Sequence, residues 1–349
     1  MKSPTLHWLN DVISHPCPPS RSAAAARQAQ LTKPPGSLGR LETLVADFAG
    51  WQGRPKPALE QVRVCVFAAD HGVAAQGVSA FPQAVTTQMV ANFCAGGAAV
   101  SVLGRLCQAD FRVVDMGCLS EPDAHPLLID RRQGPGTADF TRAPAMTSEQ
   151  LVRAIAAGRE QVVSGDFDLF IGGEMGIGNT TAASAIQAAL LGVKPERVAG
   201  PGTGVDVRTI EHKQRIVAQA LSRHRADIRS PLGVLRCLGG FEIAALVGAY
   251  IGAAQRGVPV LVDGYISTAA ALTACRINPG VRAWLLFGHQ SAEPGHRLML
   301  RYMEAEPLLS LGMRLGEGSG AALAVPLIQS ALALHREMAT FAEAGVSDA

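Results

Sequence analysis

Short apolar runs alternate with longer helical patterns along most of this 349-residue chain. The runs predict buried strands at 62–68, 111–115, 167–171, 258–262 and 283–287. Strands that alternate with helices predict an α/β fold, with a largely parallel sheet and helices on both faces. Each run ends near glycine, aspartate or histidine, and ligands bind at the carboxyl ends of the strands in such sheets.

The segments between the strands give more local predictions. Ser37 can cap a helix whose apolar face is Leu38, Leu41, Leu44, Val45 and Phe48. One long helix is expected from about Gln83 to Cys107, with Gly96 and Gly97 allowing a close neighbour. We expect an irregular arm at 1–20 and a surface loop or flexible flap at 118–147.

Composition and charge exclude several classes of function. A formal net charge of +2 gives no basic surface for nucleic acid. No apolar run reaches the ~18 residues of a membrane span, and the N-terminus lacks the apolar region of a signal peptide. The seven cysteines are scattered without a C-x-x-C pair, which is typical of reduced cysteines in a cytoplasmic protein.

The stretch 172–181, Gly-Gly-Glu-Met-Gly-Ile-Gly-Asn-Thr-Thr, lies between a predicted strand and a predicted helix. This arrangement aims backbone N–H groups and a helix dipole at an anion. The spacing almost matches a P-loop, but Asn179 stands where the lysine that reaches the outer phosphates belongs, so a monophosphate is favoured. Glu174 would repel further phosphates and could accept hydrogen bonds from a sugar. The alternative is a tight turn whose glycines serve packing alone.

Few other residues suggest chemistry. The chain has no G-x-G-x-x-G after a strand, no H-E-x-x-H and no cysteine cluster. Asp70, His71 and His289 could bind a metal, although structural hydrogen bonding is the default for histidines at such spacing. Glu174 and Glu317 each lie among glycines at a predicted helix start, where a carboxylate can act as a cap. In an apolar pocket the pKa of Glu317 would rise, which suits that carboxylate to accept a proton.

Taken together, several motifs resemble the nicotinate-nucleotide–dimethylbenzimidazole phosphoribosyltransferase family, which prepares the lower ligand of cobalamin. The motifs occur in family order at 32–42, 69–73, 77–79, 173–181, 200–204, 288–291 and 315–320. The resemblance implies transfer of phosphoribose from nicotinate mononucleotide to 5,6-dimethylbenzimidazole by a homodimer, without metal or cofactor. It also implies a Rossmann-like domain at 56–315 and a small helical domain built from 1–55 and 316–349.

The resemblance also implies roles for individual residues. Glu317 would be the general base and Glu174 would hold the ribose. The phosphate would be held by Gly176, Gly178, Asn179, Thr180, Gly202, Lys213 and Ser291. The base pocket would be walled by Ser79, Phe81, Gln88, Met175 and Leu315. A nucleotide-dependent oxidoreductase and a non-catalytic nucleotide sensor remain as alternatives on the same fold.

Overall fold

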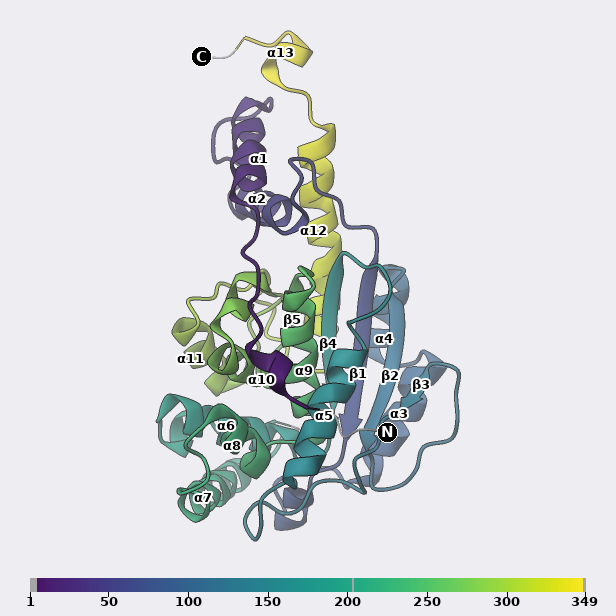
Figure 1. Ribbon diagram of the computed structural model, residues 1–349, viewed down its shortest axis with the longest axis vertical. Helices are drawn as coiled ribbons and strands as arrows, with labels where there is room; N and C mark the ends of the chain where they lie inside the picture. The colour runs from purple at the N-terminus through teal and green to yellow at the C-terminus, as the bar shows by residue number, and fades with distance from the viewer. Residues whose placement is uncertain (1–4, 203, 348–349) are drawn as a thin grey trace.

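The fold is built on a six-stranded sheet, shown in a computed structural model that describes residues 5–202 and 204–347 (Figure 1). Thr203 of the predicted second glycine turn and residues 1–4 of the predicted arm lie outside the described residues. The strand order is β3-β2-β1-β4-β5-β6 and each pairing is parallel. The strands are β1 Val62–Ala69, β2 Asp110–Gly117, β3 Leu128–Asp130, β4 Leu169–Met175, β5 Val260–Val262 and β6 Leu285–Phe287. The predicted Rossmann-like parallel sheet is therefore confirmed.

The strand order reverses at β1, which pairs with β2 on one side and with β4 on the other. Val66 is the register partner of Val113 in β2 and of Gly173 in β4. A parallel sheet opens a crevice at the carboxyl ends of the strands that flank such a reversal. The chain leaves β1 at Asp70 and β4 at Gly176, so these two exits mark where a ligand site is expected.

Helices cover both faces of the sheet, as the buried strands require. One face packs against α5 Ser148–Glu160, α9 Phe241–Gln255 and α10 Tyr265–Ile277, and α6 Asn179–Leu191 packs on α10 (Figure 1). The other packs against α3 Ala84–Ala95, α4 Ala99–Leu106 and α12 Ser319–Glu337. Along β1, Phe67 belongs to the first core and Val66 to the second. The helix pair α5–α9 packs closely because a Cβ at Gly158 would lie 1.8 Å from the Ala245 carbonyl oxygen.

Helices from the N-terminal and C-terminal parts of the chain pack together beyond one end of the sheet (Figure 1). α1 Pro18–Gln30 and α2 Arg40–Gln52 lie beside the second half of α12, and α13 Phe341–Ala344 follows. Leu31 forms an antiparallel bridge with Thr340, and Gln28 Nε2 lies 3.0 Å from His335 Nδ1. The N-terminal arm is more ordered than predicted, because η1 His7–Asn10 places Leu9 in the main core.

Helices α7 Val207–Arg223 and α8 Pro231–Leu238 pack outside α6, and α11 Pro294–Tyr302 packs on α10 (Figure 1). The short 3-10 helices are η2 Gly72–Gln76, η3 Pro195–Arg197 and η4 Pro279–Trp284.

Two local predictions were wrong, and a third was correct only in part. The expected single helix at 83–107 is two helices, because Gly96 takes a left-handed φ of +82° and ends α3. Ser37 does not cap a helix; its N–H closes a turn onto Pro34, and α2 begins after Gly39. The segment 118–147 is mostly loop, as predicted, but it contains β3, and its Thr137 N–H donates to the Asp70 carbonyl at 3.0 Å.

The segment Ala84–Leu106, which spans α3 and α4, is long and apolar enough by composition to cross a membrane, with a mean hydropathy of 1.4. Gly96 and Gly97 interrupt it, so it is not one continuous helix. Only 33% of the apolar window is buried within the chain, which leaves much of its surface uncovered.

Candidate active site

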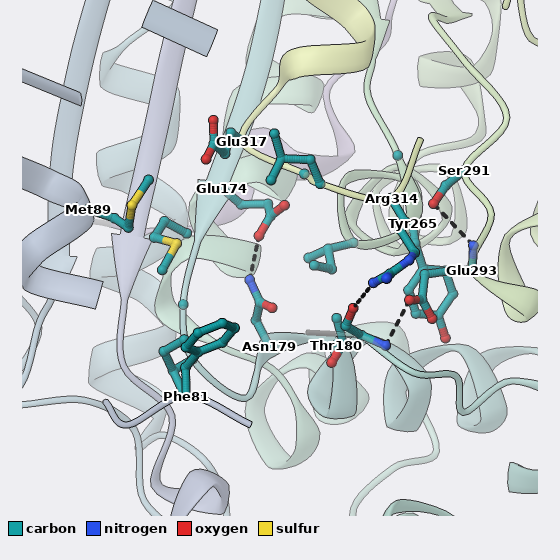
Figure 2. Close-up of a pocket in the computed structure, with 18 of the residues that line it drawn as sticks. Phe81, Met89, Glu174, Asn179, Thr180, Tyr265, Ser291, Glu293, Arg314 and Glu317 are labelled. Atoms are coloured by element: carbon teal, nitrogen blue, oxygen red, sulfur yellow. Dashed lines mark hydrogen bonds between the residues drawn. The ribbon is translucent and has the colours of Figure 1, made fainter. Parts of the chain in front are cut away.

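A cavity of about 440 Å³ lies at the carboxyl ends of β4, β5 and β6 (Figure 2). One side is apolar and includes Phe81 and Met89, while the opposite side carries Ser291, Glu293 and Arg314. Glu174 and Asn179 lie between the two sides and point toward each other. The cavity therefore offers an apolar wall for a flat ring, a polar centre, and a far wall with a cationic side chain.

The predicted anion-binding turn is shorter than the sequence suggested. β4 continues to Met175, and the turn proper is Gly176–Gly178, with Gly178 at φ +100° before α6 begins at Asn179. Gly172 and Gly173 belong to the strand and serve close packing. A Cβ on Gly173 would lie 1.9 Å from the Glu317 carbonyl oxygen. The packing explanation therefore holds for Gly172 and Gly173, and anion binding stays a prediction for the turn Gly176–Gly178.

Two basic side chains lie behind and beside the start of α6. Lys213 of α7 is buried and donates from Nζ to Thr180 Oγ1 at 3.1 Å and to the Gly200 carbonyl at 2.9 Å. Burial lowers the pKa of Lys213 to about 8, and the negative charge of Glu293 opposes this effect. Arg314 lines the cavity and donates from Nη1 to the Gly202 carbonyl at 2.9 Å. These cations and the helix start make this side of the cavity suited to an anion.

Glu293 connects this anion-binding side to the loop at Gly202. Its Oε1 accepts the Gly202 N–H at 2.8 Å, and its own N–H donates to Ser291 Oγ at 3.3 Å. Burial raises the pKa of Glu293, while Lys213 and the N–H of Gly202 act in the opposite direction. The sequence reasoning overlooked Glu293 and Arg314, although both lie within three residues of predicted motifs.

Glu174 is buried at the centre of the cavity, where Asn179 Nδ2 donates to its Oε2. Burial raises its pKa well above the ordinary value, and the negative charges of Asp263 and Glu242 raise it further. A carboxyl group in this environment can accept or donate a hydrogen bond, which suits it to contact sugar hydroxyls.

Glu317 lies in the turn before α12 and is a non-glycine residue with φ +66°. Its side chain is buried, and Oε2 accepts the Val100 N–H near the start of α4 at 3.4 Å. Burial raises the pKa of Glu317, as does Asp263, whereas the Val100 hydrogen bond lowers it. A strained, buried carboxylate with a raised pKa is typical of a general base.

The structure brings most of the predicted site residues together. Those that line the cavity are Phe81, Glu174, Met175, Gly176, Asn179, Thr180, Gly202, Ser291, Leu315 and Glu317. Gly178 caps α6, Lys213 supports Thr180 from behind, and Ser79 Oγ accepts the Phe81 N–H at 3.2 Å. Gln88 is not brought to this cavity; it lines a second cavity on the other side of α3, together with Glu121 and His125.

The residues considered as metal ligands have other contacts. Asp70 accepts Thr86 Oγ1 at 2.8 Å and the Leu119 N–H at 2.7 Å. His71 Nε2 lies 2.7 Å from Glu242 Oε1, and both side chains are fully buried beneath the turn. His289 lines the cavity, with Nε2 3.6 Å from Asp263 Oδ1. His71 therefore has the structural hydrogen bond expected by default, whereas neither ring nitrogen of His289 has a hydrogen-bond partner among the described residues.

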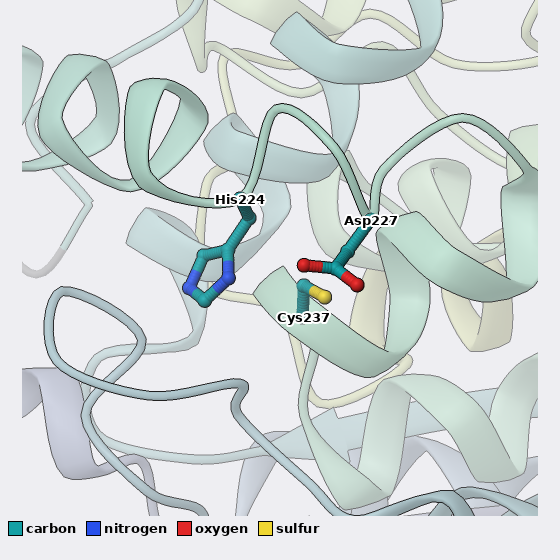
Figure 3. Close-up of side chains that lie close together, drawn as sticks. All are labelled: His224, Asp227 and Cys237. Carbon is teal, nitrogen blue, oxygen red and sulfur yellow. The ribbon is translucent and has the colours of Figure 1, made fainter.

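His224, Asp227 and Cys237 form the one group of potential metal ligands found among the described residues, and they lie outside this cavity (Figure 3). Their ligand atoms lie within 4.8 Å of one another. Arg236 Nη2 donates to Asp227 Oδ1 at 3.3 Å, and His224 Nε2 lies 2.7 Å from the Phe140 carbonyl. The guanidinium charge beside Asp227 disfavours a cation there.

Comparison with known proteins gives consistent matches over almost the whole chain. The sequence profile of a family described as "Phosphoribosyltransferase" matches residues 13–346. A nicotinate-nucleotide–dimethylbenzimidazole phosphoribosyltransferase of Xanthomonas euvesicatoria is 58% identical, with 98% of this chain and 99% of the relative covered. A protein of the same name from Pseudomonas putida is 55% identical, with 99% of each chain covered.

A solved structure is similar as well. The crystal structure of a protein with this name from Thermus thermophilus superposes with a TM-score of 0.90 and is 45% identical. The match covers 95% of this chain and all of the solved chain.

Proposed function

We infer the reaction from the premise that this chain belongs to the nicotinate-nucleotide–dimethylbenzimidazole phosphoribosyltransferase family. The enzyme transfers the 5-phosphoribosyl group of nicotinate mononucleotide to 5,6-dimethylbenzimidazole and releases nicotinate and α-ribazole 5′-phosphate. The observation that carries this assignment at the site is a single cavity that joins an apolar wall, a carboxylate base and an anion-binding turn.

In our proposal, the polar groups of the nucleotide bind on the polar side of the cavity and the benzimidazole binds on the apolar side. The phosphate binds at the Gly176–Thr180 turn and near Gly202, with Arg314 beside it and Lys213 behind. The ribose contacts Glu174. The benzimidazole lies against the apolar wall that contains Phe81, Met89 and Leu315.

The chemical step is a single displacement. The benzimidazole nitrogen attacks the anomeric carbon as the bond from that carbon to the nicotinate ring nitrogen breaks. The bonding electrons neutralise the pyridinium, so nicotinate leaves without a general acid. The N–H proton of the other azole nitrogen passes to Glu317. One inversion converts the β-nucleotide into an α-riboside, and both substrates must be bound together.

We propose that the step needs neither a metal nor a cofactor. The donor carries one phosphate, so no pyrophosphate requires a divalent ion. Arg314 and Lys213 supply positive charge near that phosphate.

The test is to incubate the purified protein with both substrates and to separate the products by chromatography. We expect release of nicotinate that depends on dimethylbenzimidazole. Release without the azole, or no release with both substrates present, would contradict the proposed transfer.

We further propose a homodimer that works in the cytoplasm, with a small helical domain formed by 1–55 and 316–349 against a catalytic domain at 56–315. All seven cysteines are free thiols in the structure, which supports a reducing compartment. Val102 and Leu106 on α4 are 42% and 73% exposed, which supports association through this apolar surface. Light scattering after size-exclusion chromatography should give twice the monomer mass, and Leu106→Glu should reduce it.

A further inference from the structure

We propose that Asp263 is a positioning residue for the reaction. Its carboxylate anchors the left-handed turn that carries Glu317 and places a fixed negative charge behind that base. The inference rests on the proposed role of Glu317. Asp263 does not line the cavity, so its influence must act through Glu317 and its neighbours.

The anchoring is visible in the hydrogen bonds of Asp263, which follows β5 and is fully buried. Its Oδ2 accepts the Gly318 N–H at 3.2 Å, and its Oδ1 accepts the Ala321 N–H at 2.8 Å. Gly318 is the N-cap of α12 and has no side chain to cap the helix itself. Asp263 therefore supplies, from another strand, the cap that fixes the first turn of α12.

The Glu317 turn requires an anchor because its backbone conformation is unfavourable for side chains. Gly316, Glu317 and Gly318 have φ values of +86°, +66° and +95°. Strand β4 supports the turn at Gly173, where the backbones are in close contact. Asp263 holds the following peptide from β5. The base is thus fixed between two neighbouring strands, which limits movement of its carboxylate.

The charge of Asp263 is defined by its surroundings. Both of its oxygens accept N–H groups, and it lies at the positive end of a helix of 19 residues. The titratable groups that face it from neighbouring elements are Glu174, Tyr250, His289 and Glu317. Burial raises the pKa of Asp263, whereas His289, whose Nε2 lies 3.6 Å from Oδ1, and the accepted N–H groups act in the opposite direction. Two accepted N–H bonds and the helix start support an ionised Asp263 at neutral pH.

An ionised Asp263 affects the pH dependence of the reaction in one direction. Its negative charge raises the pKa of Glu317. A general base is active only when deprotonated, so turnover falls as the pH decreases through this raised pKa. Removing the charge lowers the pKa of Glu317, so the acidic limb of the pH–rate profile moves to lower pH. Loss of the anchor separately reduces kcat.

The test compares D263N with D263E and with E242Q. D263N removes the charge and one accepted N–H bond, whereas D263E keeps the charge and displaces it. Glu242 is an equally buried carboxylate whose charge affects Glu174 and not Glu317. Initial rates with nicotinate mononucleotide and dimethylbenzimidazole are measured from acidic to neutral pH. Melting curves and nucleotide binding establish that each variant is folded.

We expect D263N to lower kcat by at least about tenfold and to move the acidic limb down by about 1 pH unit. D263E keeps the negative charge, so it should lower kcat without moving the acidic limb of the pH–rate profile. E242Q should also leave this limb in place. If D263N does not move the acidic limb, the proposed effect of the Asp263 charge on the pKa of Glu317 is refuted. Unchanged kcat in D263E would overturn the anchoring part, even if D263N failed to fold.

The unchanged enzyme and E317Q separate this inference from the proposed function. If the unchanged enzyme releases no nicotinate, or if E317Q keeps the acidic limb, the role of Glu317 fails first. If E317Q abolishes the acidic limb of the pH–rate profile but D263N leaves that limb in place, only the role of Asp263 is refuted.

Discussion

Gly173→Ala offers a sharp test of how the base is held. Gly173 lies in a central strand of the sheet and faces the Glu317 turn. An added Cβ would lie 1.9 Å from the Glu317 carbonyl oxygen and 2.6 Å from its carbon. Both are backbone atoms, so no side-chain rotation can relieve the contact.

The geometry fixes the size of the expected effect. Ordinary contact begins at 3.4 Å, so the Glu317 backbone must move by about 1.5 Å. Overpacking of this kind costs about 1–3 kcal/mol of stability. A displacement of about 1 Å at a catalytic group costs about 10²-fold in rate. We therefore expect a folded variant whose kcat is about 10²-fold lower, with little change in nucleotide binding.

Gly172→Ala is the matched control because it adds the same methyl group one residue earlier. Its Cβ would meet Leu246 Cδ2 at 2.4 Å and Tyr250 at 3.0 Å, which are side chains of α9 on the other face. Thermal unfolding and steady-state kinetics on both variants separate stability from catalysis. G172A should lose stability and retain kcat. The reasoning is refuted if G173A turns over normally, or if both variants lose kcat equally at matched folded fractions.

Three further predictions concern the cavity itself. Glu317→Gln should lower kcat by about 10²–10⁴-fold while calorimetry shows nucleotide binding unchanged; near-normal turnover would remove Glu317 from the mechanism. Lys213→Met should raise the KM for nicotinate mononucleotide more than it lowers kcat. In the wild-type enzyme the same KM should rise as the pH increases through about 8, where Lys213 loses its charge, and a flat KM would show that this charge does not contribute to phosphate binding. Exhaustive chelation should leave kcat unchanged; a loss restored by a divalent ion would contradict a metal-free reaction.

The sequence predicted the sheet and the approximate position of the site because both depend on local signals. Buried apolar runs define strands, and their carboxyl ends define one edge of a parallel sheet. Glu174 and Glu317 stood out because glycines surround them. The approach of Gly173 to Glu317 could not be predicted, since it depends on which turn packs on which strand.

Other differences also have long-range causes. Asp263 and Glu293 act on the backbones of Gly318 and Gly202, which lie 55 and 91 residues away along the chain. No local pattern reports such partners. Gln88 was expected at the base pocket, but its position on α3 places it in another cavity. A helical pattern fixes which residues share a face but does not identify the neighbour of that face.

The most direct test of the account is the configuration of the product. Purified enzyme is mixed with β-nicotinate mononucleotide and dimethylbenzimidazole, and the ribosylated azole is analysed by NMR. Single displacement in one cavity predicts the α-anomer, formed together with an equal amount of nicotinate. A β-anomer, or a ribosylated Glu174 trapped with nucleotide alone, would contradict it.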